Sequence, residues 1–142
     1  MSNRVTLELV SQSGGGSPIV MGDAPLGKVA FDLVSVEPGT YTVGSREGEG
    51  YSDERPRHAV ELTRGYQLGV VPVTQALWHA VTGKRPSHFE GGERPVEQVS
   101  WHDAVGFCNG LSECFGLSPA YRLSGESVSC DFDALPFFSR FA

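Results

Sequence analysis

The chain has few basic residues and no long apolar run, and each shortage excludes a class of protein. Lys and Arg together number 11 against 17 Asp and Glu, which gives a formal net charge of −6 over 142 residues. Because contacts to phosphates need a basic patch, and no segment clusters Lys or Arg, we expect no nucleic-acid partner. No apolar run approaches the roughly 20 residues that cross a bilayer, so we expect no membrane span.

Cysteine is also scarce. Cys108, Cys114 and Cys130 make an odd count of 3 without a Cys-x-x-Cys spacing, which argues against a disulfide framework and a structural zinc site. The first ten residues alternate polar and apolar side chains and so lack the apolar core of a signal peptide. Together these features predict a cytoplasmic protein.

Glycine and proline are abundant, with 18 and 9 residues. Both favour turns, so we expect short elements joined by long loops rather than a helix bundle. A hydrophobic content of 39% and a charged content of 20% are typical of a globular domain. The predicted fold class is α+β, with short, mostly antiparallel strands, two helices and long loops.

Three segments are predicted along the chain. Residues 1–28 are expected to be flexible, because the Ser-Gln-Ser-Gly-Gly-Gly-Ser stretch at residues 11–17 is typical of a linker, although the first ten residues could form a loose strand. Residues 29–134 should form the folded part. Residues 135–142 form a divergent tail that contains three phenylalanines.

Alternation of apolar and polar residues predicts the strands. The predicted strands are residues 29–36, 41–43, 58–62, 66–71, 121–123 and 127–130. We expect the first two to form a hairpin through a turn at Pro38 and Gly39. The third and fourth should pair through a turn at residues 63–65.

Capping signals predict two helices. Thr74 should cap a helix at residues 75–82, which Gly83 ends. Ser100 should open the second helix, with Asp103 completing an approximate capping box. Their predicted buried faces are Leu77, Trp78 and Val81 in the first helix, and Trp101, Ala104, Val105, Cys108, Leu111 and Phe115 in the second, which Gly116 ends.

Four segments in order resemble the formylglycine-generating enzyme family, also called the sulfatase-modifying-factor family. They are residues 36–45, 53–60, 68–78 and 94–109. They are similar, in turn, to the family's opening hairpin, its Asp-Glu-x-Pro-x-His-x-Val segment, its Glu-Val-Thr-Asn helix start and its Pro-Val-x-x-Val-Ser-Trp-x-Asp-Ala segment. The resemblance covers about residues 29–134 and implies the N-terminal part of a C-type-lectin-like domain.

The resemblance also bears on activity. In bacterial relatives the strand pair after the long helix leads into Gly-Tyr-Arg-Leu-Pro-Thr-Glu-Ala-Glu-Trp-Glu-Tyr-Ala, whereas in this chain Leu-Pro-Phe-Phe at residues 135–138 replaces that motif. In the oxygen-dependent enzymes, the copper-binding cysteines, the calcium-binding loops and much of the substrate groove lie beyond this point. The resemblance therefore implies no catalytic, cofactor-binding or metal-binding residue in this chain, and no cofactor, although full-length relatives use copper and calcium.

Three functions stay open. The chain is expected to be a truncated family member without activity of its own. It could instead be a shortened non-catalytic module that binds a protein partner or a ligand. It could also be a metal-dependent oxidoreductase that converts a cysteine of a sulfatase substrate to formylglycine.

Individual candidate residues have ordinary interpretations. Cys108 and Cys114 face different sides of one helix, and Cys108 fits its buried face. An iron site of two histidines and one carboxylate could use His102 or His58 with Glu61, but the spacing favours no metal role over surface histidines. His79 and His88 lie on other elements without a ligand spacing.

The acids and tryptophans also have structural explanations. Glu47, Glu49, Asp53 and Glu54 are spaced too irregularly for an EF-hand-like calcium loop and are expected to be solvated. Asp103 is expected to act as the helix-start acid. Trp78 and Trp101 are expected in the core, although a tryptophan can also line a ligand groove.

Overall fold

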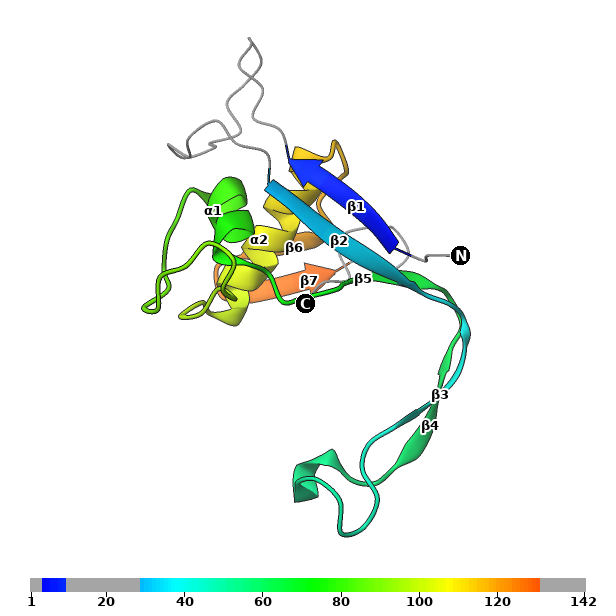
Figure 1. The fold of residues 1–142 in the computed structure, drawn as a ribbon. Coiled ribbons are helices and arrows are strands. Elements are labelled where there is room, and N and C mark those ends of the chain that lie inside the picture. The colour runs from blue at the N-terminus through cyan, green and yellow to red at the C-terminus, as the bar shows by residue number, and fades with distance from the viewer. Residues whose placement is uncertain (1–3, 10–28, 131–142) are drawn as a thin grey trace. The chain divides into compact units, whose positions relative to one another are not determined.

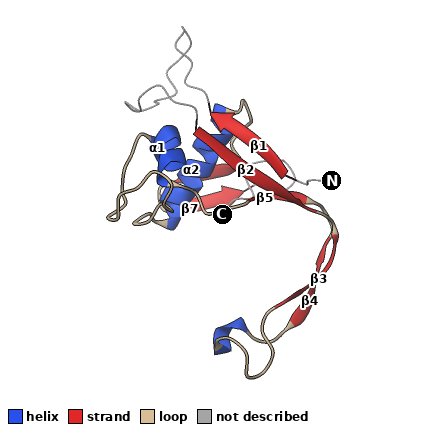
Figure 2. Cartoon of the chain, in the orientation of Figure 1, coloured by secondary structure: helices blue, strands red, loops and turns tan. Residues whose placement is uncertain are grey.

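A computed structural model describes residues 4–9 and 29–130 (Figure 1). The elements in chain order are β1 (Arg4–Leu9), β2 (Val29–Val36), β3 (Gly39–Val43), the short 3-10 helix η1 (Ser52–Glu54), β4 (His58–Leu62), β5 (Tyr66–Gly69), α1 (Gln75–Thr82), α2 (Trp101–Cys114), β6 (Tyr121–Ser124) and β7 (Ser127–Cys130). The predicted α+β class with two helices and antiparallel strands is confirmed (Figure 2). No helix in this part of the chain combines the length and apolar character of a membrane span.

The chain divides into two compact units. The main unit comprises Met1–Val34 and Gln67–Ala142, and the ribbon unit comprises Ser35–Tyr66. A sheet of order β1-β2-β5 belongs largely to the main unit. β1 runs antiparallel to β2, with Arg4 opposite Val34 and Leu9 opposite Val29. Residues 4–9 therefore belong to the sheet rather than to a flexible segment, whereas residues 10–28 lie outside the described residues.

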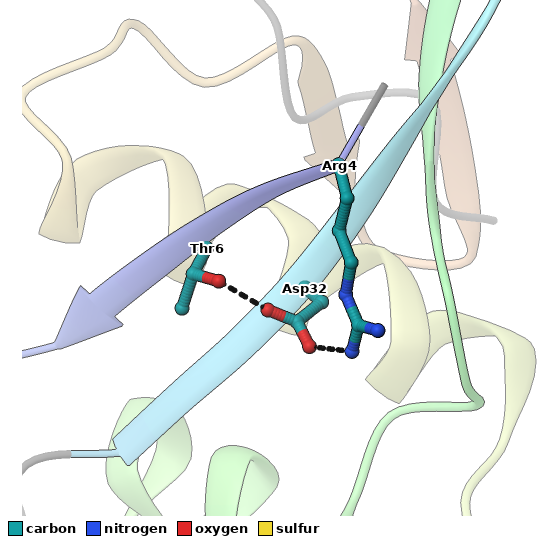
Figure 3. Close-up of polar contacts among 3 residues, drawn as sticks. All are labelled: Arg4, Thr6 and Asp32. Carbon is teal, nitrogen blue, oxygen red and sulfur yellow. Dashed lines mark hydrogen bonds and ion pairs between the residues drawn. The ribbon is translucent and has the colours of Figure 1, made fainter. Parts of the chain in front are cut away.

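Asp32 in the middle of β2 joins all three strands of this sheet. Its carboxylate accepts hydrogen bonds from Thr6 and Arg4 of β1, and Arg4 also forms an ion pair with it (Figure 3). Its backbone oxygen accepts a bond of 2.9 Å from the amide of Val70, directly after β5. The bonds from Thr6 and Arg4 hold the pKa of Asp32 below its ordinary value, because they stabilise the charged form.

The core of the main unit lies between this sheet and the two helices. Leu33 of β2 is fully buried, and Leu9 of β1 is 5% exposed. Trp78 of α1 stacks on Phe107 of α2, with ring centroids 5.0 Å apart and nearly parallel planes. The predicted buried face of α1 is confirmed, since Leu77, Trp78 and Val81 all belong to the core.

The helix ends follow the predicted signals. The Thr74 side chain accepts a hydrogen bond from the amide of Leu77, and Gly83 ends α1 in the left-handed conformation. At α2, the Ser100 side chain accepts from the Asp103 amide while the Asp103 carboxylate accepts from the Ser100 amide. The predicted capping box is thus confirmed.

The predicted burial of Trp101 is wrong. Its side chain is 58% exposed, whereas Val105, Cys108 and Leu111 are buried as predicted. Trp101 continues the spacing of that face, but it is the first residue of α2 and extends past the core. Its ring instead meets the edge of the His102 ring at a centroid distance of 5.1 Å.

Both predicted pairings in the N-terminal half are wrong. β3 pairs with β4, with Tyr41 opposite Val60, and β5 joins β2 instead of β4. Glu37 and Pro38 lie between β2 and β3, but these two strands belong to different sheets, so the chain forms no hairpin there. It reverses in the following loop, where the Ser45 amide donates to the Glu54 carbonyl at 3.0 Å.

The C-terminal strands are placed as predicted. β6 and β7 form an antiparallel pair in which Tyr121 lies opposite Cys130, and Gly125 takes a positive φ of 60° in the turn. Asn109 of α2 fastens this pair, since its side chain donates to the Tyr121 carbonyl at 2.8 Å and accepts from the Tyr121 amide at 3.1 Å.

Replacing Asp32 with Asn should destabilise the main unit near neutral pH, because the amide cannot reproduce the charged bonds to Arg4 and Thr6. The lowered pKa means that Asp32 contributes stability above its ordinary pKa of 3.8 and that this contribution is lost as the pH falls through the folded-state value. Urea unfolding should show a variant deficit that shrinks on acidification. The exposed Asp53→Asn variant is the control, and an equal deficit at acidic and neutral pH would contradict the assignment.

Candidate functional site

Two pockets lined by described residues of the main unit are candidates for a binding site. The first, which we call the sheet–helix pocket, has a volume of about 300 Å³ and lies between β2, the segment after β5 and the two helices. Its lining is mainly apolar, with Phe31, Val71, Leu77, Phe107 and Leu111 among its residues. Its charged lining residues are Arg4, Asp32 and Glu93.

The second, which we call the loop pocket, has a volume of about 450 Å³ and is lined by α1 and the loop that follows it. Trp78 and Gln75 line it from α1. The loop contributes Arg85, Glu90 and Val96, together with Pro86, Ser87, Gly91 and Gly92. This pocket is more polar than the first and combines one basic with one acidic side chain.

Two side chains fasten the loop around this pocket. The Gln75 amide nitrogen donates to the Phe89 carbonyl at 2.8 Å, and its oxygen accepts from the Gly91 amide at 3.0 Å. One Glu97 carboxylate oxygen accepts from the amides of His88 and Phe89. Sequence reasoning missed both roles, because a Gln in a first helical turn and a Glu beyond two prolines form no pattern that names a partner.

His79 is a buried residue that contacts the guanidinium group of Arg85. Its side chain is 8% exposed, so the expectation of a surface histidine is wrong here. A guanidinium nitrogen of Arg85 lies 3.5 Å from its Nδ1. Burial first, and then the charge of Arg85, lowers the pKa of His79, so the ring is neutral at pH 7 and can face the cation as an acceptor.

The other three histidines make separate contacts. His58 Nδ1 lies 2.8 Å from the Pro56 carbonyl, and His102 Nε2 lies 3.0 Å from the Glu126 carbonyl. His88 meets the edge of the Phe89 ring. Within residues 4–9 and 29–130, no three His, Cys, Asp or Glu side chains gather in a way that could hold a metal ion.

Cys108 and Cys114 are thiols with little reactivity. Cys108 is 3% exposed, and its burial raises its pKa to about 11. Burial, followed by the nearby Glu113 charge, also raises the pKa of Cys114. Because the thiolate is the reactive form, both remain protonated and poorly nucleophilic at neutral pH. The structure confirms the predicted core role of Cys108.

The acidic loop of the ribbon unit is exposed. Glu47, Glu49, Asp53 and Glu54 all face solvent, and Glu54 accepts a hydrogen bond of 2.6 Å from the Ser45 hydroxyl. Glu61 and His58 lie on β4 at positions three apart, which places them on opposite faces of the strand. The candidate pair is therefore not assembled.

Comparison with known proteins decides the family. The model of the sulfatase-modifying factor enzyme 1-like domain matches residues 22–127, which is most of the folded part. The chain belongs to the sulfatase-modifying-factor family. This confirms the resemblance carried by the four sequence segments.

The chain is similar to two further proteins over most of its length. The chain is 40% identical over 103 residues to the chaperone protein LppX of Paenibacillus barcinonensis, a match that covers 72% of this chain and 34% of that protein. It is also similar to the solved Treponema denticola variable protein 1, with a TM-score of 0.60 and 38% identity, over 77% of this chain and 40% of the other. The chain thus spans between a third and two fifths of the length of these relatives.

Replacing His79 with Asn should weaken the dependence of stability on pH. A buried neutral histidine has a lowered pKa, so the unfolded chain binds more protons and stability falls as the pH drops below the ordinary value of 6.5. Urea midpoints between about pH 8 and about pH 5 should therefore change more in the parent than in the variant. The exposed His88→Asn variant should behave like the parent, and identical profiles for the parent and the His79 variant would refute the assignment.

Proposed function

We propose that this chain is a non-catalytic member of the sulfatase-modifying-factor family that acts by binding another polypeptide. The observation that carries the proposal is the composition of the sheet–helix pocket. It offers apolar side chains to a ligand, but its ionisable lining residues are only Arg4, Asp32 and Glu93. Asp32 is engaged by Thr6 and Arg4, and no histidine of the described residues lines this pocket, so it offers no pair of a nucleophile and a histidine base.

Apolar surface continues from the pocket to its rim. Val70 and Val71, which line it after β5, are 42% and 60% exposed. Exposed apolar groups beside a pocket are typical of protein-interaction surfaces. An extended apolar segment of a partner could bury these two valines and insert a side chain between the sheet and the helices.

The relatives' names support a binding role. One is named a chaperone protein and the other a variable protein, and neither name describes an oxidoreductase. The match covers only part of each, so the binding of a polypeptide comes to this chain as a proposal. The proposal also retains the cytoplasmic location and the lack of a cofactor that the sequence predicts.

A binding assay with an unfolded polypeptide tests this function. Labelled, reduced and carboxymethylated α-lactalbumin should bind the full chain, as measured by fluorescence anisotropy. Val71→Asp should weaken this binding about tenfold, because it places a charge on the apolar rim. Val43→Asp in the ribbon unit is the matched control, since Val43 is 48% exposed and does not line the pocket.

Two results would overturn the proposal. One is the absence of binding to the unfolded polypeptide, or equal weakening by both variants. The other is catalysis: copper- or iron-dependent oxidation of the cysteine in a sulfatase peptide by the purified chain would establish the oxidoreductase alternative.

A further inference from the structure

The loop pocket is lined by two side chains of opposite charge. Arg85 and Glu90 both line it, and both side chains are exposed. Neither forms an ion pair with another residue in the described part of the chain. Each charge is therefore available to a ligand, and together they favour a ligand that carries both signs.

A contact with His79 restrains the side chain of Arg85. Its guanidinium lies against the neutral, buried His79 ring at 3.5 Å. The loop that carries Glu90 is fastened on either side of that residue, because Gln75 binds the Phe89 carbonyl and the Gly91 amide. Charged groups on a fixed frame lose little freedom on binding, which favours recognition of a small ligand.

The apolar part of the pocket is formed by Trp78, Pro86 and Val96. Trp78 is 3% exposed, and its Nε1 is a buried donor that meets no hydrogen-bond acceptor among the described residues. The indole therefore contributes apolar surface to the wall of the pocket, which an apolar group of a ligand can cover.

We propose that the loop pocket binds a free α-amino acid with an apolar side chain. Its carboxylate pairs with Arg85, its ammonium group with Glu90, and its side chain packs toward Trp78 and Val96. A singly charged ligand leaves one of the two protein charges unpaired, so recognition depends on the zwitterion. This site is separate from the sheet–helix pocket and does not rest on the proposed binding of a polypeptide.

Three leucine compounds test the proposal by fluorescence titration. The full chain carries the Trp101→Phe substitution, which leaves Trp78 as the remaining tryptophan, because the chain has two. L-Leucine should change the Trp78 emission saturably. N-acetyl-L-leucine, which lacks the ammonium charge, and L-leucinamide, which lacks the carboxylate, should each bind about tenfold more weakly. Isothermal titration calorimetry on the unsubstituted chain gives a second measure of the same affinities.

Two variants then assign the charges. Arg85→Met should weaken leucine binding and remove its advantage over leucinamide, whereas Glu90→Gln should remove its advantage over the N-acetyl compound. Arg122→Met and Glu113→Gln are matched controls, since both residues are exposed and neither lines one of the two pockets. Circular dichroism verifies that all four variants keep the parental fold.

Three results would overturn the proposal. They are no saturable signal by either method at concentrations up to about 10 mM, equal affinity for the three compounds, and leucine binding that survives both pocket variants unchanged. An effect of Arg85→Met without any effect of Glu90→Gln would replace the zwitterion site with a simple carboxylate site, and so would also refute it.

Discussion

The stack of Trp78 on Phe107 is the contact on which the main unit depends. It joins α1 to α2 at the centre of the core, with ring centroids 5.0 Å apart. It also separates the two pockets, because Phe107 lines the sheet–helix pocket and Trp78 lines the loop pocket. Both candidate sites therefore share one apolar wall, and the position of each depends on the same packing of aromatic rings.

Polar groups on either side of this wall give the pockets different chemistry. Near the sheet, the Asp32 carboxylate is engaged by Thr6 and Arg4, which leaves a mainly apolar pocket suited to a polypeptide side chain. Near the loop, Gln75 and Glu97 form hydrogen bonds with backbone groups. Arg85 and Glu90 line the loop pocket and form no ion pair among the described residues, so both can contact a ligand. The two pockets differ in chemistry because their charged side chains differ in how many bonds they form within the fold, not because the number of charges differs.

Local signals were sufficient for the elements but not for their partners. The caps at Thr74 and Ser100 and the end at Gly83 follow from interactions within a few residues, and all three were predictable. The pairing of β3 with β4 was not, because Pro38 and Gly39 are typical of a hairpin turn, yet Pro38 forms only a bend and Gly39 already belongs to β3. The predicted burial of Trp101 was also wrong, because helical spacing shows which face of a helix a residue occupies but not where the core ends.

By itself, the amino-acid sequence determined the family, the α+β class, the helix limits and the burial of Cys108, because each depends on short motifs or on the periodicity of one segment. Only the tertiary structure decided the sheet order, the burial of His79 beneath Arg85 and the make-up of the two pockets. These depend on contacts between segments far apart in the chain, such as Gln75 with Gly91 or Arg4 with Asp32. For such contacts, local sequence favours several possible partners almost equally, and the packing of the whole unit determines which partner is used.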